Sequence, residues 1–159
     1  EEEVAEKVAL GALKYSLLRV GLGKDIIFDA VLALSLEGDT GPYLQYTHAR
    51  LKSILRKIGA RMKKPPLSVT MSSIERQLAR TIVSFPETVQ TAANSFSPSI
   101  LSTYLHNMAM IANEFYHQSP VAKEKDATKK QFRLSLVELT AATLQKGLNI
   151  LGISAPEKM

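Results

Sequence analysis

Two tyrosines and several basic residues lie close together in residues 36–57, LEGDTGPYLQYTHARLKSILRK. Positions i, i+3, i+7 and i+14 share one stripe of a helix, and here they hold Tyr43, Tyr46, Arg50 and Lys57. Aromatic rings stack unpaired bases at about 1 to 3 kcal/mol each, and neighbouring cations bind the backbone. The stripe indicates binding of single-stranded or loop RNA. The alternative is that the tyrosines lie half-buried against a neighbouring helix.

The positive charge of the chain is concentrated in its middle. Residues 1–39 carry four basic and eight acidic side chains, and residues 75–159 carry nine and seven. Residues 40–74 contain no acidic side chain and seven basic ones: Arg50, Lys52, Arg56, Lys57, Arg61, Lys63 and Lys64. Such a run attracts an anionic partner such as a phosphate backbone, although it is also typical of a solvated helix face. The candidates for phosphate contacts are Lys52, Arg56, Lys57, Lys63 and Lys64.

Motifs for catalysis, metal binding and nucleotide binding are absent from the sequence. There is no GxxxxGK[ST], GxGxxG or HExxH string, and no cysteine. The histidines His48, His106 and His117 are far apart, so a structural role is expected for each. Glu37 and Asp39 could form a pair of carboxylates, but a turn with helix capping explains Asp39 better. We therefore expect no catalytic residue, metal or cofactor in this chain.

The composition is that of one globular domain of 159 residues, with 45% hydrophobic and 22% charged residues. No apolar run approaches the roughly 18 residues that a membrane span needs, so no membrane contact is expected. Because cysteine is absent, nothing favours an oxidising compartment, and a cytoplasmic protein is expected. Because the chain opens on Glu1 rather than on methionine, we expect a fragment of a longer protein. We also expect a monomer.

Apolar residues recur with a period near 3.6 in every segment, which predicts an all-α protein. A first helix should end near Gly21, and a second should begin at Thr40 or Gly41 and end at Gly59. Ile26 to Phe28 could form a short extended piece and Asp29 could cap a brief helix through Leu34, and the sequence leaves this segment ambiguous. The prolines in residues 59–73 predict a loop. A seam on the last helix predicts a helical bundle: Leu134, Val137, Ala141, Leu144, Leu148 and Leu151.

Several strings resemble arginyl-tRNA synthetases. LSLEGDTGPYLQYTHARLKSILRK resembles the passage from their catalytic domain into their anticodon-binding domain, and VALGALKYSLLRV followed by KDIIFD resembles the helical connector before it. LARTIVSFPETVQTAA, LSTYLHNMAMIANEFYHQSPV and LGISAPEKM resemble their C-terminal, DALR-type domain. The resemblance covers essentially the whole chain and implies an all-α helical bundle of the class I synthetase anticodon-binding type.

The resemblance also implies a division of the chain. Residues 1–39 would be a connector from the end of the catalytic domain, and residues 40–159 an α-helical anticodon-binding domain. The HIGH and KMSKS signatures are missing, so the chain alone is predicted to be inactive, whereas the full-length enzyme would use ATP and Mg. The implied partners are the anticodon stem-loop of arginine tRNA and the catalytic domain of the same chain.

The resemblance implies that five residues of this chain contact the anticodon. Tyr43, Tyr46 and Arg50 match its anticodon-contacting helix, Tyr116 matches an aromatic residue on its long helix, and Met159 matches the terminal residue that closes over the anticodon. We predict that these residues receive splayed bases, while the lysines and Arg56 hold phosphates.

The chain departs from the family at a few positions. Ala30 and Leu36 stand where aromatic residues are frequent, and Asp39 and Thr103 where Asn is frequent. The first pair puts the packing of the connector in doubt, and Thr103 leaves the role of that Asn unassigned. Two alternatives stay open. The chain could be the anticodon-binding domain of another synthetase, such as the glycyl β subunit, or a protein-interaction bundle whose last helix docks a partner.

Overall fold

The computed structural model describes residues 2–59 and 69–159, and these residues form helices and no strand. The elements are α1 (Glu2–Leu18), α2 (Ala30–Ala33), α3 (Gly41–Ile58), α4 (Ser73–Val83), α5 (Phe85–Asn94), α6 (Pro98–Gln118), the 3-10 helix η1 (Val121–Lys123) and α7 (Ala127–Ile150). The all-α prediction is confirmed. Most of the expected loop at 59–73 lies outside the described residues. In the described ranges, no helix has the length and apolar character needed to cross a membrane.

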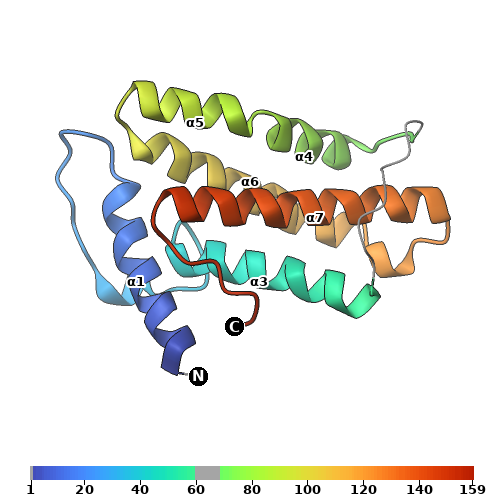
Figure 1. Cartoon of the computed structure of the whole chain (residues 1–159), viewed down its shortest axis with the longest axis horizontal. Helices are drawn as coiled ribbons and strands as arrows, with labels where there is room; N and C mark the ends of the chain where they lie inside the picture. Colours follow the sequence, from blue (N-terminus) through green and yellow to red (C-terminus); the bar gives the residue numbers. More distant parts are fainter. Residues whose placement is uncertain (1, 60–68) are drawn as a thin grey trace.

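The long helices α3, α6 and α7 form the body of the bundle (Figure 1). Helix α7 contacts α3, α4 and α6, and α4 and α5 both pack on α6. Helix α1 instead crosses the beginning of α3. After α7, the red C-terminal segment in Figure 1 turns back and runs beside α3. Helix α1 and the C-terminal segment therefore both lie against α3.

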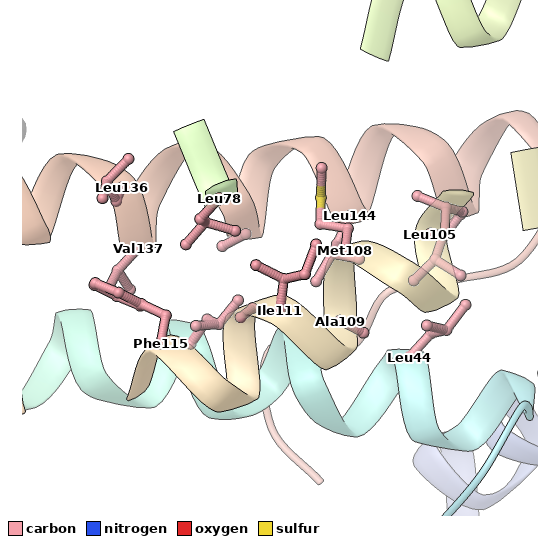
Figure 2. Packing of buried hydrophobic residues seen from close by; sticks show 14 of the residues in the cluster. Leu44, Leu78, Leu105, Met108, Ala109, Ile111, Phe115, Leu136, Val137 and Leu144 are labelled. Atoms are coloured by element: carbon pink, nitrogen blue, oxygen red, sulfur yellow. The ribbon is translucent and has the colours of Figure 1, made fainter. Parts of the chain in front are cut away.

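The core lies where α3, α4, α6 and α7 meet (Figure 2). Leucines from each of these helices have no exposed surface: Leu44, Leu78, Leu105 and Leu144. Complete burial of such a side chain stabilises the fold by about 1.5 to 3 kcal/mol. The predicted seam of α7 is buried at each of its six positions, from Leu134 to Leu151. Because this chain covers the seam itself, the seam is not free to dock a protein partner.

Local signals in the sequence explain the helix ends. The Thr40 hydroxyl accepts a hydrogen bond from the Tyr43 N–H at 3.1 Å, and Gly59 ends α3 with a φ of 64°. Ser72 and Glu75 form a capping box at α4. Asp29 caps α2 by accepting from the N–H groups of Val31 and Leu32, which confirms the short helix after Asp29, while residues 26–28 are not helical.

A buried ion pair joins α4 to α7. Arg133 Nε lies 2.7 Å from Glu75 Oε1, and the same guanidinium lies 2.8 Å from Glu124. Burial alone would raise the pKa of Glu75, but hydrogen bonds from the Ser72 N–H and from Arg133 lower the pKa below its usual value. Glu75 therefore stays ionised although it is fully buried.

Asp39 corrects one expectation from the sequence. Its carboxylate does not cap α3, because Thr40 does so. It instead accepts hydrogen bonds from the buried Tyr15 hydroxyl at 2.6 Å and from Arg19 at 3.0 Å. Burial and the adjacent carboxylate raise the pKa of Tyr15. The buried phenol requires an acceptor, and Asp39 supplies it across the junction of α1 and α3.

Candidate nucleic-acid interface

The predicted stripe on α3 is present, but its two tyrosines differ in environment. Tyr46 is 41% exposed, whereas Tyr43 is half-buried against the core. The Tyr43 hydroxyl accepts a hydrogen bond from Asn113 Nδ2 at 2.8 Å, and its ring centroid lies 5.6 Å from that of His106. Tyr43 thus packs against α6, while the ring of Tyr46 is accessible to solvent.

Arg50 reaches from α3 across to α6. Its guanidinium carbon lies 4.6 Å from the centroid of the Tyr116 ring, which is a cation-π contact. Within residues 2–59 and 69–159, Arg50 takes part in no ion pair with a carboxylate. The aromatic contact orients the guanidinium without neutralising it, so its donors remain able to bind an external acceptor.

The C-terminal segment, residues 152–159, forms the other side of this surface. Met159 is 45% exposed. It shares a cavity of about 370 Å³ with Tyr46, Arg50 and Arg56, and a second, more apolar cavity of about 730 Å³ with Tyr46 and Val8. Both volumes lie within the range of small-ligand sites. We call the surface formed by Tyr43, Tyr46, Arg50, Tyr116 and Met159 the α3 surface.

The predicted phosphate-binding residues occupy different places. Lys52 pairs with Glu157 at 2.9 Å, and Arg56 donates to the Glu157 carbonyl oxygen at 3.0 Å. Hydrogen bonding and charge attraction from Lys52 lower the pKa of Glu157. Lys57 is exposed. Lys63 and Lys64 lie outside the described residues.

The family model described as the DALR anticodon binding domain matches residues 44–159. The chain belongs to this family. The match begins within α3 and extends through α7 to the end of the chain, so it includes every residue of the α3 surface except Tyr43.

Sequence and structure comparisons agree with this membership. The DALR chain is 40% identical over 99% of its length to the arginine-tRNA ligase of Bdellovibrio bacteriovorus, of which it covers 27%. Arginyl-tRNA synthetase of Thermus thermophilus matches 99% of the chain with a TM-score of 0.92 and 42% identity, and the chain covers 28% of it. The enzyme of Plasmodium falciparum matches with a TM-score of 0.88, 26% identity and the same two coverages. The chain thus spans little more than a quarter of the length of these relatives.

Residue spacing alone did not identify all residues of the DALR domain that shape this surface. Gln45 and His48 are completely buried and bind the carbonyl groups of Ser154 and Pro156. Asn113 supports Tyr43 from α6. The sequence did contain a signal for Gln45 and His48, because both are polar residues between Leu44 and Leu51 on the inner face of the helix. Such residues need buried partners, but spacing cannot say which.

His48 fits the structural role expected for the histidines. Its Nδ1 lies 2.9 Å from the Pro156 carbonyl oxygen. Because a carbonyl only accepts, Nδ1 carries the hydrogen. Burial lowers the pKa of His48, so the imidazole is neutral at pH 7. In the part of the DALR chain that the structure describes, no group of three or more His, Asp or Glu residues is placed to hold a metal ion.

Proposed function

We propose that this DALR domain binds the anticodon loop of arginine tRNA as the C-terminal part of a longer arginine-tRNA ligase. One observation carries the proposal. The exposed ring of Tyr46 and the unneutralised guanidinium of Arg50, both from α3, line one cavity of ligand size together with the thioether of Met159 from the C-terminal segment. Such rings and cations suit unstacked bases of a loop. Relatives named arginine-tRNA ligase favour arginine over the glycyl alternative.

In this proposal, the residues of the α3 surface contact the bases, and the neighbouring basic residues contact the phosphates. Tyr46 stacks a base, and Arg50, oriented by Tyr116, donates hydrogen bonds to a base edge. Met159 closes the opposite side. Lys57, Lys63 and Lys64 hold phosphates with little sequence preference. Lys52 and Arg56 already contact the C-terminal segment, but each keeps further donors for a phosphate oxygen.

Catalysis is assigned to a different part of the longer protein. The relatives are more than three times as long as this chain, and their names describe ligases. ATP and Mg would bind to that other part, and the 159-residue chain alone would be inactive. We expect a cytoplasmic, monomeric enzyme, and sedimentation of the purified protein would test the second expectation.

The connector offers a surface for that catalytic domain. Ile27 is 91% exposed and Val31 is 82% exposed, and their neighbours Leu22 and Leu32 are also exposed. Several exposed apolar side chains within one short segment are typical of an interaction surface. We infer that the catalytic domain of the same chain covers it.

The test compares Arg50→Ala with the double change Lys63→Ala and Lys64→Ala. Both are measured with an arginine anticodon stem-loop and with stem-loops of altered anticodon. Arg50→Ala should cost about 1 to 3 kcal/mol on the matched RNA and little on the others, so discrimination falls. The double lysine variant should weaken all RNAs alike and reduce the salt slope by about 1.4. Equal losses on all RNAs for both variants would contradict the division of work.

A further inference from the structure

The C-terminal segment is bound along one face of α3. Four residues of α3 at spacings of three and four contact it: Gln45, His48, Lys52 and Arg56. These spacings place the four side chains on one face of the helix. From α1, Lys14 also donates to the Gly152 carbonyl oxygen at 2.5 Å. The segment is therefore held at several points from residue 152 to residue 157.

The two inner contacts bind the backbone of the segment. Gln45 Nε2 donates to the Ser154 carbonyl oxygen at 2.8 Å, and His48 Nδ1 donates to the Pro156 carbonyl oxygen at 2.9 Å. The same Gln45 nitrogen donates to the Lys7 carbonyl oxygen of α1 at 3.0 Å, so both its hydrogens are used. Gln45 thus joins α1, α3 and the C-terminal segment.

The buried contacts of Gln45 and His48 should hold the segment more firmly than the exposed pair of Lys52 with Glu157. The pair of Lys52 with Glu157 is solvent-exposed, since 58% of the Glu157 side chain is accessible, and exposed pairs contribute little and are screened by salt. Gln45 and His48 have no exposed surface. Removal of a buried donor leaves a carbonyl group without a partner away from water, which is costly.

We propose that Gln45 and His48 are positioning residues of the α3 surface. From the buried face of the helix they fix the register of the C-terminal segment, and this register holds Met159 beside Tyr46 and Arg50. Met159 is the third residue after Pro156, and an extended chain of three residues spans about 10 Å. Met159 consequently cannot move far from Tyr46 while Pro156 is held. The inference rests on the proposed function.

The test uses His48→Leu, which removes the donor, and His48→Asn, which keeps a donor near the position of Nδ1. Thr140→Val is the matched control, because Thr140 is buried and also donates one hydrogen bond to a carbonyl oxygen, at Leu136 within α7. Amide order parameters of residues 157–159 report tail position, and affinity for an arginine anticodon stem-loop reports function. Circular dichroism verifies folding of each variant.

In His48→Leu we expect the order parameters to fall below about 0.6 and affinity to fall about tenfold. His48→Asn should restore both, and Thr140→Val should change neither. In a chain truncated after Ile153, His48→Leu should have no additional effect on affinity. A further loss there, or an unchanged tail in His48→Leu, overturns the inference.

The proposed function and this inference fail in different ways. A wild-type chain that does not bind the arginine stem-loop overturns the function, and with it the inference. A wild-type chain that binds, while His48→Leu binds equally well, overturns the inference alone.

Discussion

At the scale of single residues, His48 couples the fold to pH. It is buried, and its Nδ1–H is bound to Pro156. Burial lowers the pKa of His48 from its ordinary value of 6.5, because the charged form would lose its hydration. The unfolded chain therefore takes up this proton at a higher pH than the folded chain. The contribution of His48 to stability is complete above about pH 6.5 and decreases as the pH falls toward the folded pKa.

We expect the free energy of unfolding to decrease between about pH 7.5 and about pH 5.5, and to decrease less in His48→Asn, which cannot titrate. Urea unfolding at the two pH values measures both decreases. Every other ionisable side chain is the same in both proteins, so the difference between the two decreases isolates His48. Identical decreases would show that His48 is not protonated differently in the two states.

The two tyrosines show what residue spacing can and cannot predict. Two residues three positions apart in a helix differ by about 60° around its axis, so it was predictable that Tyr43 and Tyr46 share a stripe. The same 60° is enough to turn Tyr43 toward Asn113 on α6 and Tyr46 toward Met159. Which ring is half-buried depends on neighbours distant in sequence. The half-buried alternative therefore applies to Tyr43, whereas Tyr46 is exposed.

At the scale of elements, the crossing of α1 and α3 depends on glycine. A Cβ atom on Gly41 would overlap the carbonyl carbon and oxygen of Gly11, and it would lie 3.0 Å from Tyr15 Cβ. These are mostly backbone atoms, which cannot rotate away as a flexible side chain can. Alanine normally stabilises a helix by about 1 kcal/mol relative to glycine. At this position the steric overlap should exceed that gain.

We expect Gly41→Ala to lower the free energy of unfolding by about 1 to 3 kcal/mol, the usual cost of overpacking. Gly21→Ala is the matched control, because its Cβ would meet only the Lys24 side chain, at 4.0 Å. Chemical denaturation of both variants and the wild type gives the comparison. A Gly41→Ala chain as stable as the Gly21→Ala chain would mean that α1 can shift on α3 at little cost.

Helix ends were predictable because their causes are local. Thr40 lies three residues from the N–H that it accepts, and Ser72 lies three residues from Glu75. Asp39 was misjudged because its partner Tyr15 is 24 residues away. The docking of the C-terminal segment was not predictable, since His48 and Pro156 are 108 residues apart. The periodic pattern indicates that a helix face is buried, but not which segment covers it.

At the scale of the whole molecule, several apolar side chains of residues 22–32 are exposed. Ile27 and Val31 are 91% and 82% exposed. The segment between α1 and α2 projects to one side of the bundle (Figure 1). Exposure of such residues contributes nothing to the stability of this chain by itself. If the catalytic domain of a longer protein covers them, their burial stabilises the contact at about 25 cal/mol per Å² of apolar area.

The double change Ile27→Ser and Val31→Ser should have different effects in the 159-residue chain alone and in a longer protein that contains the catalytic domain. In the 159-residue chain, the free energy of unfolding should change by less than about 0.5 kcal/mol, because both side chains are exposed. In the longer ligase, the same change should lower the unfolding temperature, because apolar contact between the domains is lost. Val83→Ser is the control: Val83 is 78% exposed at the end of α4, and its change should be neutral in both proteins. Calorimetry measures the unfolding temperature of both proteins. A double change that is neutral in both would mean that the catalytic domain does not cover the connector.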